Sequence, residues 1–314
     1  MSASRRIMPT RTELAAAALA ATALAHAFFV QPLLFWPLVS IILSSAVLAM
    51  HSPLALSRRM TFLAHAQAHS ILTAALAAAV SLAAVSAGMS VAQYYALVLT
   101  YVVLLNLAVL AVGRLGLRED AATGVVMSMQ ISATIILLFA LRSLYSTTID
   151  PLALITGEYV LITRDDVIMQ IPFLAAATLY PIVFGTMYLY TAVDEHYAQA
   201  TGVRLRLLDI LFLVSMSVAV AASVYTLGSL MPAVLLVMPG AVAMRYTHKL
   251  TNLIPTAVSI ALISVALAHF LYTLIPALWP TAAVGLALLA LLLAKPENGL
   301  RKNKRSDTSV TISE

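Results

Sequence analysis

The sequence predicts an all-α polytopic membrane protein with about ten transmembrane helices. Hydrophobic residues make up 62% of the 314-residue chain and charged residues only 10%, whereas roughly a quarter of the residues of a soluble domain are charged. The apolar residues are gathered in long runs, and a helix that crosses a bilayer needs about 20 of them. Composition and run length together exclude a water-soluble core.

The expected spans follow one another without an intervening soluble domain. The sequence therefore predicts a cytoplasmic N-terminal segment at 1–13, one membrane domain at 14–295, and a basic cytoplasmic tail at 296–314 whose polar composition is typical of disorder. The spans are expected at 14–30, 33–56, 61–87, 91–112, 121–141, 167–190, 207–227, 229–247, 253–275 and 277–295.

The placement of positive charge orients these spans. If residue 1 is cytoplasmic, all but two of the 18 Lys and Arg residues fall in inner segments, the exceptions being Arg142 and Arg164. This asymmetry predicts that both termini are cytoplasmic. It also argues against a nucleic-acid partner, which would require a basic face on a folded surface. Residues 1–27 also fit a cleaved signal peptide, and that alternative stays open.

The motifs that are missing limit the chemistry of the chain. There is no GxxxxGK[ST] phosphate loop and no GxGxxG, so ATP must be hydrolysed by another subunit, and the chain is expected to be neither an enzyme nor a holder of a cofactor. HExxH and GxSxG are absent too, which counts against zinc proteases and serine hydrolases. With no cysteine, metal ligands must come from His, Asp and Glu.

One polar constellation lies just inside the third span. His65 and His69 are four positions apart, so on a helix they share a face with about 6 Å of rise between them, and both imidazoles can approach one ion. Ionisable side chains within a span usually face a cavity or a pathway. The alternative is that both rings are neutral and bonded to neighbouring helices.

The remaining histidines are scattered along the chain. His51 lies near the inner end of the second span, and His269 lies in the outer half of the ninth. Either could complete a metal site with His65 and His69 only if the fold brings it close. Otherwise each is a packed core residue.

Four segments together resemble the permease subunits of the zinc/manganese family of ABC importers. They carry an Arg-Arg-Met stretch before the histidine helix, a Gly-acidic pair with a trailing Asp, an Asp-x-x-x-Ala-x-x-x-Gly loop, and a Gly-x-Leu before a Leu-x-x-Pro-x-x-x-Ala helix. Their order and spacing carry the resemblance over roughly 32–295. The segments are 57–72, 150–167, 193–212 and 226–243.

The resemblance implies a cobalamin-permease-like fold and an importer of zinc or manganese in a prokaryotic plasma membrane. It also implies three partners, which are a second copy of the permease, a cytoplasmic ABC ATPase dimer and an extracytoplasmic metal-binding protein. The ATPases would grip the loop that holds Asp194, Ala198 and Gly202, and Gly202 is expected to end its helix.

The sequence departs from the family at the histidine pair. His65 stands where the family usually has an acidic residue, and Ala64 replaces the customary glycine. Imidazole is a softer ligand than carboxylate, so this departure favours zinc over manganese. It could instead indicate another substrate.

Two other readings stay open. A ten-span secondary transporter of a small metabolite would show two similar five-span halves, and no clear internal similarity is seen. A membrane metalloenzyme would need several clustered histidine motifs, and this chain has one.

Overall fold

The computed structural model describes residues 11–58, 60–85, 91–113, 115–116, 119–144, 157 and 159–294. Each span expected from the sequence coincides with a helix, which confirms the all-α fold class. The helices are α1 (Arg11–Val30), η1 (Pro32–Leu34), α2 (Phe35–Ser57), α3 (Thr61–Ala84), α4 (Val91–Gly113), α5 (Glu119–Leu144), η2 (Tyr159–Leu161), α7 (Arg164–Val193), α8 (Glu195–Ala200), α9 (Leu205–Leu227), α10 (Met231–Tyr246), α11 (Leu250–Leu274) and α12 (Pro280–Leu293).

Length and apolarity divide the spans into two groups. In the described part of the chain, seven helices are long and apolar enough to cross a membrane, namely α1, α2 with η1, α4, α5, α7, α9 and α11. The apolar part of α3, together with α10 and α12, is shorter. Turns explain the short lengths of α10 and α12, because residues 228–230 and 276–278 leave the helical path inside apolar runs. The basic tail at 296–314 lies outside the described residues.

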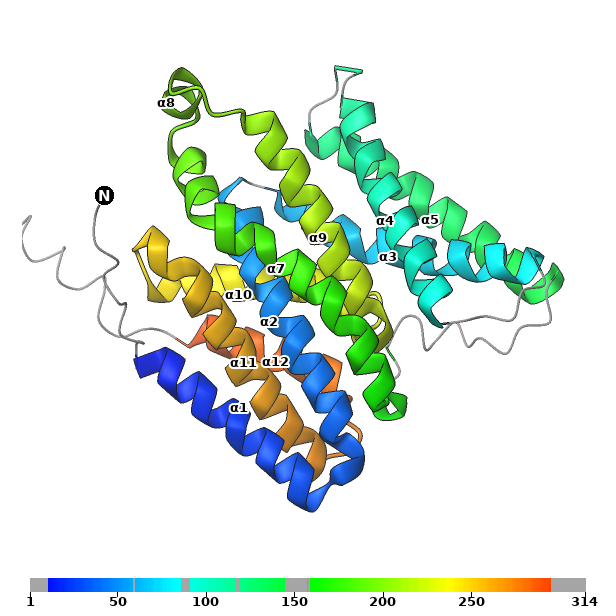
Figure 1. Ribbon diagram of the computed structural model, residues 1–314, viewed down its shortest axis with the longest axis vertical. Coiled ribbons are helices and arrows are strands. Elements are labelled where there is room, and N and C mark those ends of the chain that lie inside the picture. Colours follow the sequence, from blue (N-terminus) through cyan, green and yellow to red (C-terminus); the bar gives the residue numbers. More distant parts are fainter. Residues whose placement is uncertain are drawn as a thin grey trace, which may run out of the picture.

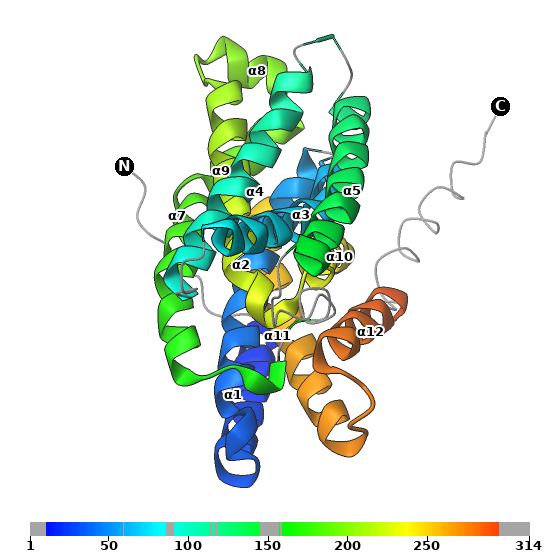
Figure 2. The same cartoon turned by 90° about the vertical axis from the view of Figure 1, so that its right-hand side faces the viewer.

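Helix α2 runs through the middle of the bundle (Figure 1) and contacts α1, α7, α9, α10 and α11. Helices α3, α4 and α5 pack on one another and form a group on one side, while α1, α11 and α12 lie on the other, as Figure 2 also shows. Helix α10 contacts α3 of the first group and both α11 and α12 of the second, and so joins the two groups, while α9 lies between α2 and α4.

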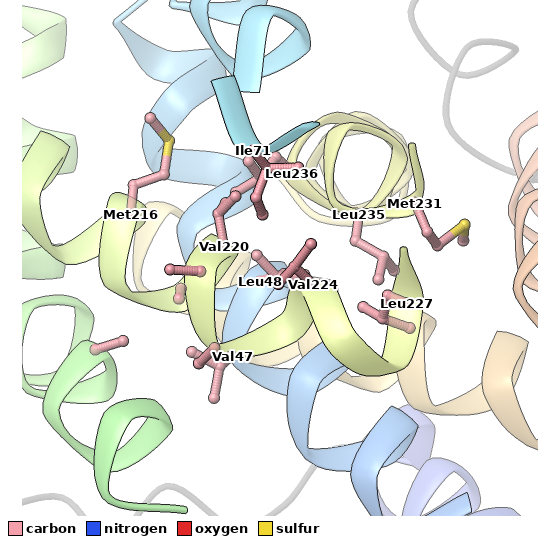
Figure 3. Close-up of a cluster of buried hydrophobic side chains, with 14 of the residues drawn as sticks. Val47, Leu48, Ile71, Met216, Val220, Val224, Leu227, Met231, Leu235 and Leu236 are labelled. Atoms are coloured by element: carbon pink, nitrogen blue, oxygen red, sulfur yellow. The ribbon is translucent and has the colours of Figure 1, made fainter. Parts of the chain in front are cut away.

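The apolar centre of the bundle lies where α2, α9 and α10 meet (Figure 3). Val47 and Leu48 of α2 pack there with Val220 and Val224 of α9, and Leu235 follows from α10. All five side chains are at most 5% exposed, and close packing of this kind is a main source of helix association in lipid.

The first helix packs into the bundle through small side chains. Ala16, Ala20, Ala23 and Ala27 of α1 are buried, and α1 lies along α11. These positions form one face of a helix, and small residues on such a face let two backbones approach closely. Residues 11–27 are therefore an integrated part of this fold.

Helix α2 also carries a stripe of polar side chains that bond to its neighbours. Ser40 Oγ donates to Gln170 Oε1 of α7 at 2.5 Å. The Nε2 of Gln170 donates to Ser44 Oγ at 2.7 Å and to the carbonyl of Ala222 in α9 at 2.8 Å. One glutamine thereby ties α7 to both α2 and α9.

The same stripe reaches α9 and α10 through two adjacent residues, His51 and Ser52. The amide of Gly240 donates to Ser52 Oγ at 2.8 Å, and α10 crosses α2 at this point. His51 lies beside Ser52 and faces Ser215 of α9. Polar groups buried at helix contacts in lipid need such partners, because water is not available to replace them.

The connection before α7 is seated on the turn between α9 and α10. Gly157 has φ +80°, and a Cβ at this position would lie 2.6 Å from the carbonyl oxygen of Thr226 and 2.7 Å from the amide nitrogen of Gly228. Tyr159 follows and is fully buried, and this burial raises the pKa of its phenol. The middle of segment 142–166 is apolar enough to predict a short helix on the membrane surface, and this segment falls mostly outside the described residues.

Substituting Gly157 by Ala should destabilise the protein more than the same change at Gly116. Both glycines have left-handed φ, at +80° and +86°, so both alanine variants lose about 1–2 kcal/mol from the backbone conformation. Only Gly157→Ala also meets backbone atoms, because nothing lies within 4 Å of a Cβ at Gly116. Thermal unfolding in detergent measures the difference. Equal unfolding midpoints for the two variants would contradict the close contact of Gly157 with the turn between α9 and α10.

Candidate functional site

The histidine pair predicted from the sequence lies on α3. The backbone is helical from Thr61 to Ala84, so His65 and His69 are about one turn apart along it. The side chain of His69 is half-buried. The side chain of His65 lies outside the described residues.

Polar bonds hold α3 against α4 and α9. Gln67 and Asn106 are buried and exchange both amide bonds, with Gln67 Nε2 donating to Asn106 Oδ1 at 2.7 Å and Asn106 Nδ2 donating back to Gln67 Oε1 at 3.1 Å. Asn106 Nδ2 also donates to Ser217 Oγ of α9. Gln67 lies between the two histidines in sequence but turns its side chain toward α4, as expected for a residue two positions away on a helix.

A second set of polar bonds joins α3 to α5. Gln130 Nε2 donates to Ser70 Oγ at 2.8 Å, and one turn further along Thr73 Oγ1 lies 2.8 Å from Thr134 Oγ1. The histidine helix is thus bonded directly to α4 and α5, and through Asn106 of α4 it is linked to α9. Such bonds set its rotation about its own axis, which apolar packing alone leaves less defined.

His51 has partners for both ring nitrogens inside the bundle. Its Nδ1 donates to the carbonyl of Val47 at 2.8 Å, and its Nε2 lies 2.9 Å from Ser215 Oγ. The ring is completely buried and packs beside Phe212. These contacts join α2 to α9 and do not bring His51 to α3.

His269 pairs with a histidine of the first helix. Its Nε2 lies 3.2 Å from Nδ1 of His26, and the two rings meet edge to face at 73°. His269 is buried, and its Nδ1 has no partner in the described part of the chain. The fold therefore places His51 and His269 in separate contacts from the α3 pair.

Within the described residues, no three His, Asp or Glu side chains stand close enough together to hold a metal ion. The predicted pair on α3 was itself expected to supply only part of a coordination shell. An ion that passes through a pathway is held by few protein ligands, and the rest of its shell comes from water or from other elements.

The second predicted site is the loop at one end of α7 and α9, which contains α8 (Figure 1). Asp194 stands between α7 and α8, and its carbonyl accepts from the amide of Ala198 at 3.2 Å. Ala198 is only 5% exposed, so it faces the body of the chain. The exposed residues of α8 include His196 and Gln199.

Gly202 ends α8, which confirms the helix terminator predicted from the sequence. Its φ is +83°, its amide donates to the carbonyl of Gln199 at 3.0 Å, and the amide of Val203 donates to that of Ala198 at 3.1 Å. This pair of bonds is a Schellman motif, which favours glycine at the left-handed position. The motif fixes the direction in which the chain leaves α8 for α9.

A bundle of apolar helices held together by buried polar bonds, with a short exposed helix at one end, is the architecture of a polytopic membrane protein. The chain belongs to the ABC 3 transport family, whose model matches residues 30–295. It is therefore the membrane-spanning component of a transport system and not a catalytic subunit. This membership decides against the secondary transporter and the metalloenzyme.

Relatives and a solved structure agree with this family. The chain is 26% identical over 202 residues to a probable metal transport system membrane protein of Thermotoga maritima, covering 64% of this chain and 67% of the relative. It is 25% identical over 147 residues to the manganese transport system membrane protein MntC of Halalkalibacterium halodurans, covering 47% and 49%. A chain of PsaBC from Streptococcus pneumoniae, solved with a Fab, has the same fold, with a TM-score of 0.73 at 17% identity over 90% of this chain and 99% of that one.

Replacing Gln67 by Leu should destabilise the permease because it leaves the buried Asn106 without its amide partner. We expect a loss of about 1–3 kcal/mol, the usual cost of an unpaired buried polar group. The double variant Gln67→Leu/Asn106→Leu should lose less than the sum of the two single variants. Unfolding in detergent measures all three, and strictly additive losses would show that the two amides do not act as a pair.

Proposed function

We propose that this chain is the permease of an ABC importer that carries a divalent metal ion, zinc or manganese, across a prokaryotic plasma membrane. ATP is hydrolysed by a separate cytoplasmic ATPase dimer, and an extracytoplasmic binding protein delivers the ion. A second copy of the permease completes the pathway, and both termini are cytoplasmic. The family match over residues 30–295 is the observation that carries this proposal, and the names of the metal-transport relatives support the cargo.

His65 and His69 are the proposed contacts of the ion in transit. The unbroken backbone of α3 supports their placement on one face. Neutral imidazole is a good ligand for zinc and for other borderline ions, whereas manganese prefers oxygen. The extra ligand role expected for His51 and His269 stays a prediction. In this structure His51 contacts α9 and His269 contacts α1.

The loop with Asp194, Ala198 and Gly202 is the proposed contact with the ATPase. Ala198 seats α8 on the permease, and the Schellman turn at Gly202 ends it. The outward residues His196 and Gln199 are then available to the partner. Because the permease has no nucleotide site, the conformational change driven by ATP hydrolysis must reach it through a surface that contacts the ATPase.

Substituting His65 or His69 by Ala should abolish metal uptake, because the ion loses a ligand. The amount of permease in the membrane and its ATPase binding should stay unchanged. Radioactive zinc and manganese uptake into cells measures this. His248→Ala is the matched control, since His248 is exposed in the connection between α10 and α11. Parental uptake of both ions by both α3 variants would remove the histidines from the pathway.

The same pair offers a test of metal preference. His65→Asp should retain uptake and shift it toward manganese, because a carboxylate replaces a softer nitrogen ligand. Competition between the two ions during uptake measures the shift.

Substituting Ala198 by Glu should release the ATPase or uncouple it, because a charged side chain cannot occupy the buried position under α8. Co-purification of the ATPase with the permease and metal uptake measure the two effects. Thr251→Glu, at an exposed position at the start of α11, is the control. Normal transport by Ala198→Glu would remove the coupling role of this loop.

A further inference from the structure

One arginine at the end of α2 contacts both α7 and α8. These two helices flank the start of the coupling loop, which is the loop with Asp194, Ala198 and Gly202. Arg58 caps α2, and its side chain is only 6% exposed although it is charged. Its Nη1 donates to Glu195 Oε1 of α8 at 2.6 Å, and its Nη2 donates to Thr191 Oγ1 of α7 at 3.0 Å. Its guanidinium also lies over the ring of Tyr188, 4.9 Å from the centroid.

A second carboxylate lies within reach of the same guanidinium. Arg58 Nε is 3.9 Å from Asp209 Oδ1 of α9, which is too long for a hydrogen bond, and Nε has no hydrogen-bond partner in the described part of the chain. Asp209 Oδ1 instead accepts from the hydroxyl of Tyr188 at 2.9 Å. Arg58 is thus bonded to α8, and its Nε, which could donate a hydrogen bond, lies beside α9.

Arg58 also stands at a tight joint that leads directly into the histidine helix. Helix α2 ends at Ser57 and α3 begins at Thr61, and the amide of Met60 donates to the carbonyl of Ala55 at 2.9 Å. The sulfur of Met60 accepts from the Tyr188 hydroxyl at 3.9 Å. With so short a connection, a displacement of Arg58 passes to the first turn of α3.

We infer that Arg58 is the positioning residue through which a movement of α8 reaches α3. The Arg58–Glu195 bond is the only described ion pair with a carboxylate of α8, and a charge-assisted bond from a largely buried arginine is strong and directional. When α8 moves, the Arg58–Glu195 bond displaces the short connection between α2 and α3 in the same direction. During this movement Arg58 Nε donates a hydrogen bond to Asp209, so the guanidinium stays paired with a carboxylate. This inference rests on the proposed function.

The test uses the complete transporter, with the permease, its ATPase and its binding protein in proteoliposomes. Arg58→Gln should keep the ATPase bound and hydrolysing ATP, and should lower the metal transported per ATP by about tenfold or more, the scale of a coupling between two sites. Arg58→Lys should recover part of this ratio. Arg245→Gln is the matched control, because Arg245 also bonds a helix end, the carbonyl of Leu292, but does not touch α8.

Glu195→Gln provides a second variant that breaks the same bond from its exposed side, since Glu195 is 55% exposed, and that leaves Arg58 in place. It should lower the ratio too, and the double variant Arg58→Gln/Glu195→Gln should be no worse than Arg58→Gln alone, because both changes break one bond. A parental ratio in Glu195→Gln, or additive losses in the double variant, would overturn the inference. Failure of the proposed function would appear differently, as a parental complex that binds no ATPase or moves no metal.

Discussion

Apolar helices gain little from leaving lipid tails, so close packing and hydrogen bonds between buried polar side chains together fix the positions of the helices in this bundle. Helix α2 makes these bonds in three directions, to Gln170 of α7, to Ser215 of α9 and to the amide of Gly240 in α10. Helix α3 repeats the arrangement through Gln67 and Ser70. The helix that carries the histidines is therefore oriented by these polar bonds together with its apolar packing.

Much of the fold could be predicted because a bilayer imposes its thickness on the sequence. The number and order of the helices followed from apolar runs, and the end of α8 followed from Gly202, whose role is local. The helix ends were less predictable where a turn lies inside an apolar run. The span expected at 229–247 is α10 from Met231 to Tyr246, because residues 228–230 form a turn that hydropathy does not detect.

Contacts between distant helices could not be predicted, because one sequence does not show which helices are neighbours. His269 was expected as a possible partner of the α3 pair and instead meets His26. Asn106 had no visible partner in the sequence. Arg58 was counted as an inner positive charge and as part of the Arg-Arg-Met stretch, and neither role indicated that it is largely buried beside α7, α8 and α9. A polar residue within an apolar run was the available signal, and it indicates a partner without naming it.

In the proposed contact with the ATPase, the two faces of α8 serve different molecules. Ala198 and the backbone bonds of the Schellman turn hold the inner face, while His196 and Gln199 are exposed on the outer face. Changes on the outer face can therefore accumulate without cost to the permease itself. A permease of this design can be matched to a different ATPase by exchanging a few outward residues of one short helix, which makes α8 a natural place to engineer hybrid transporters.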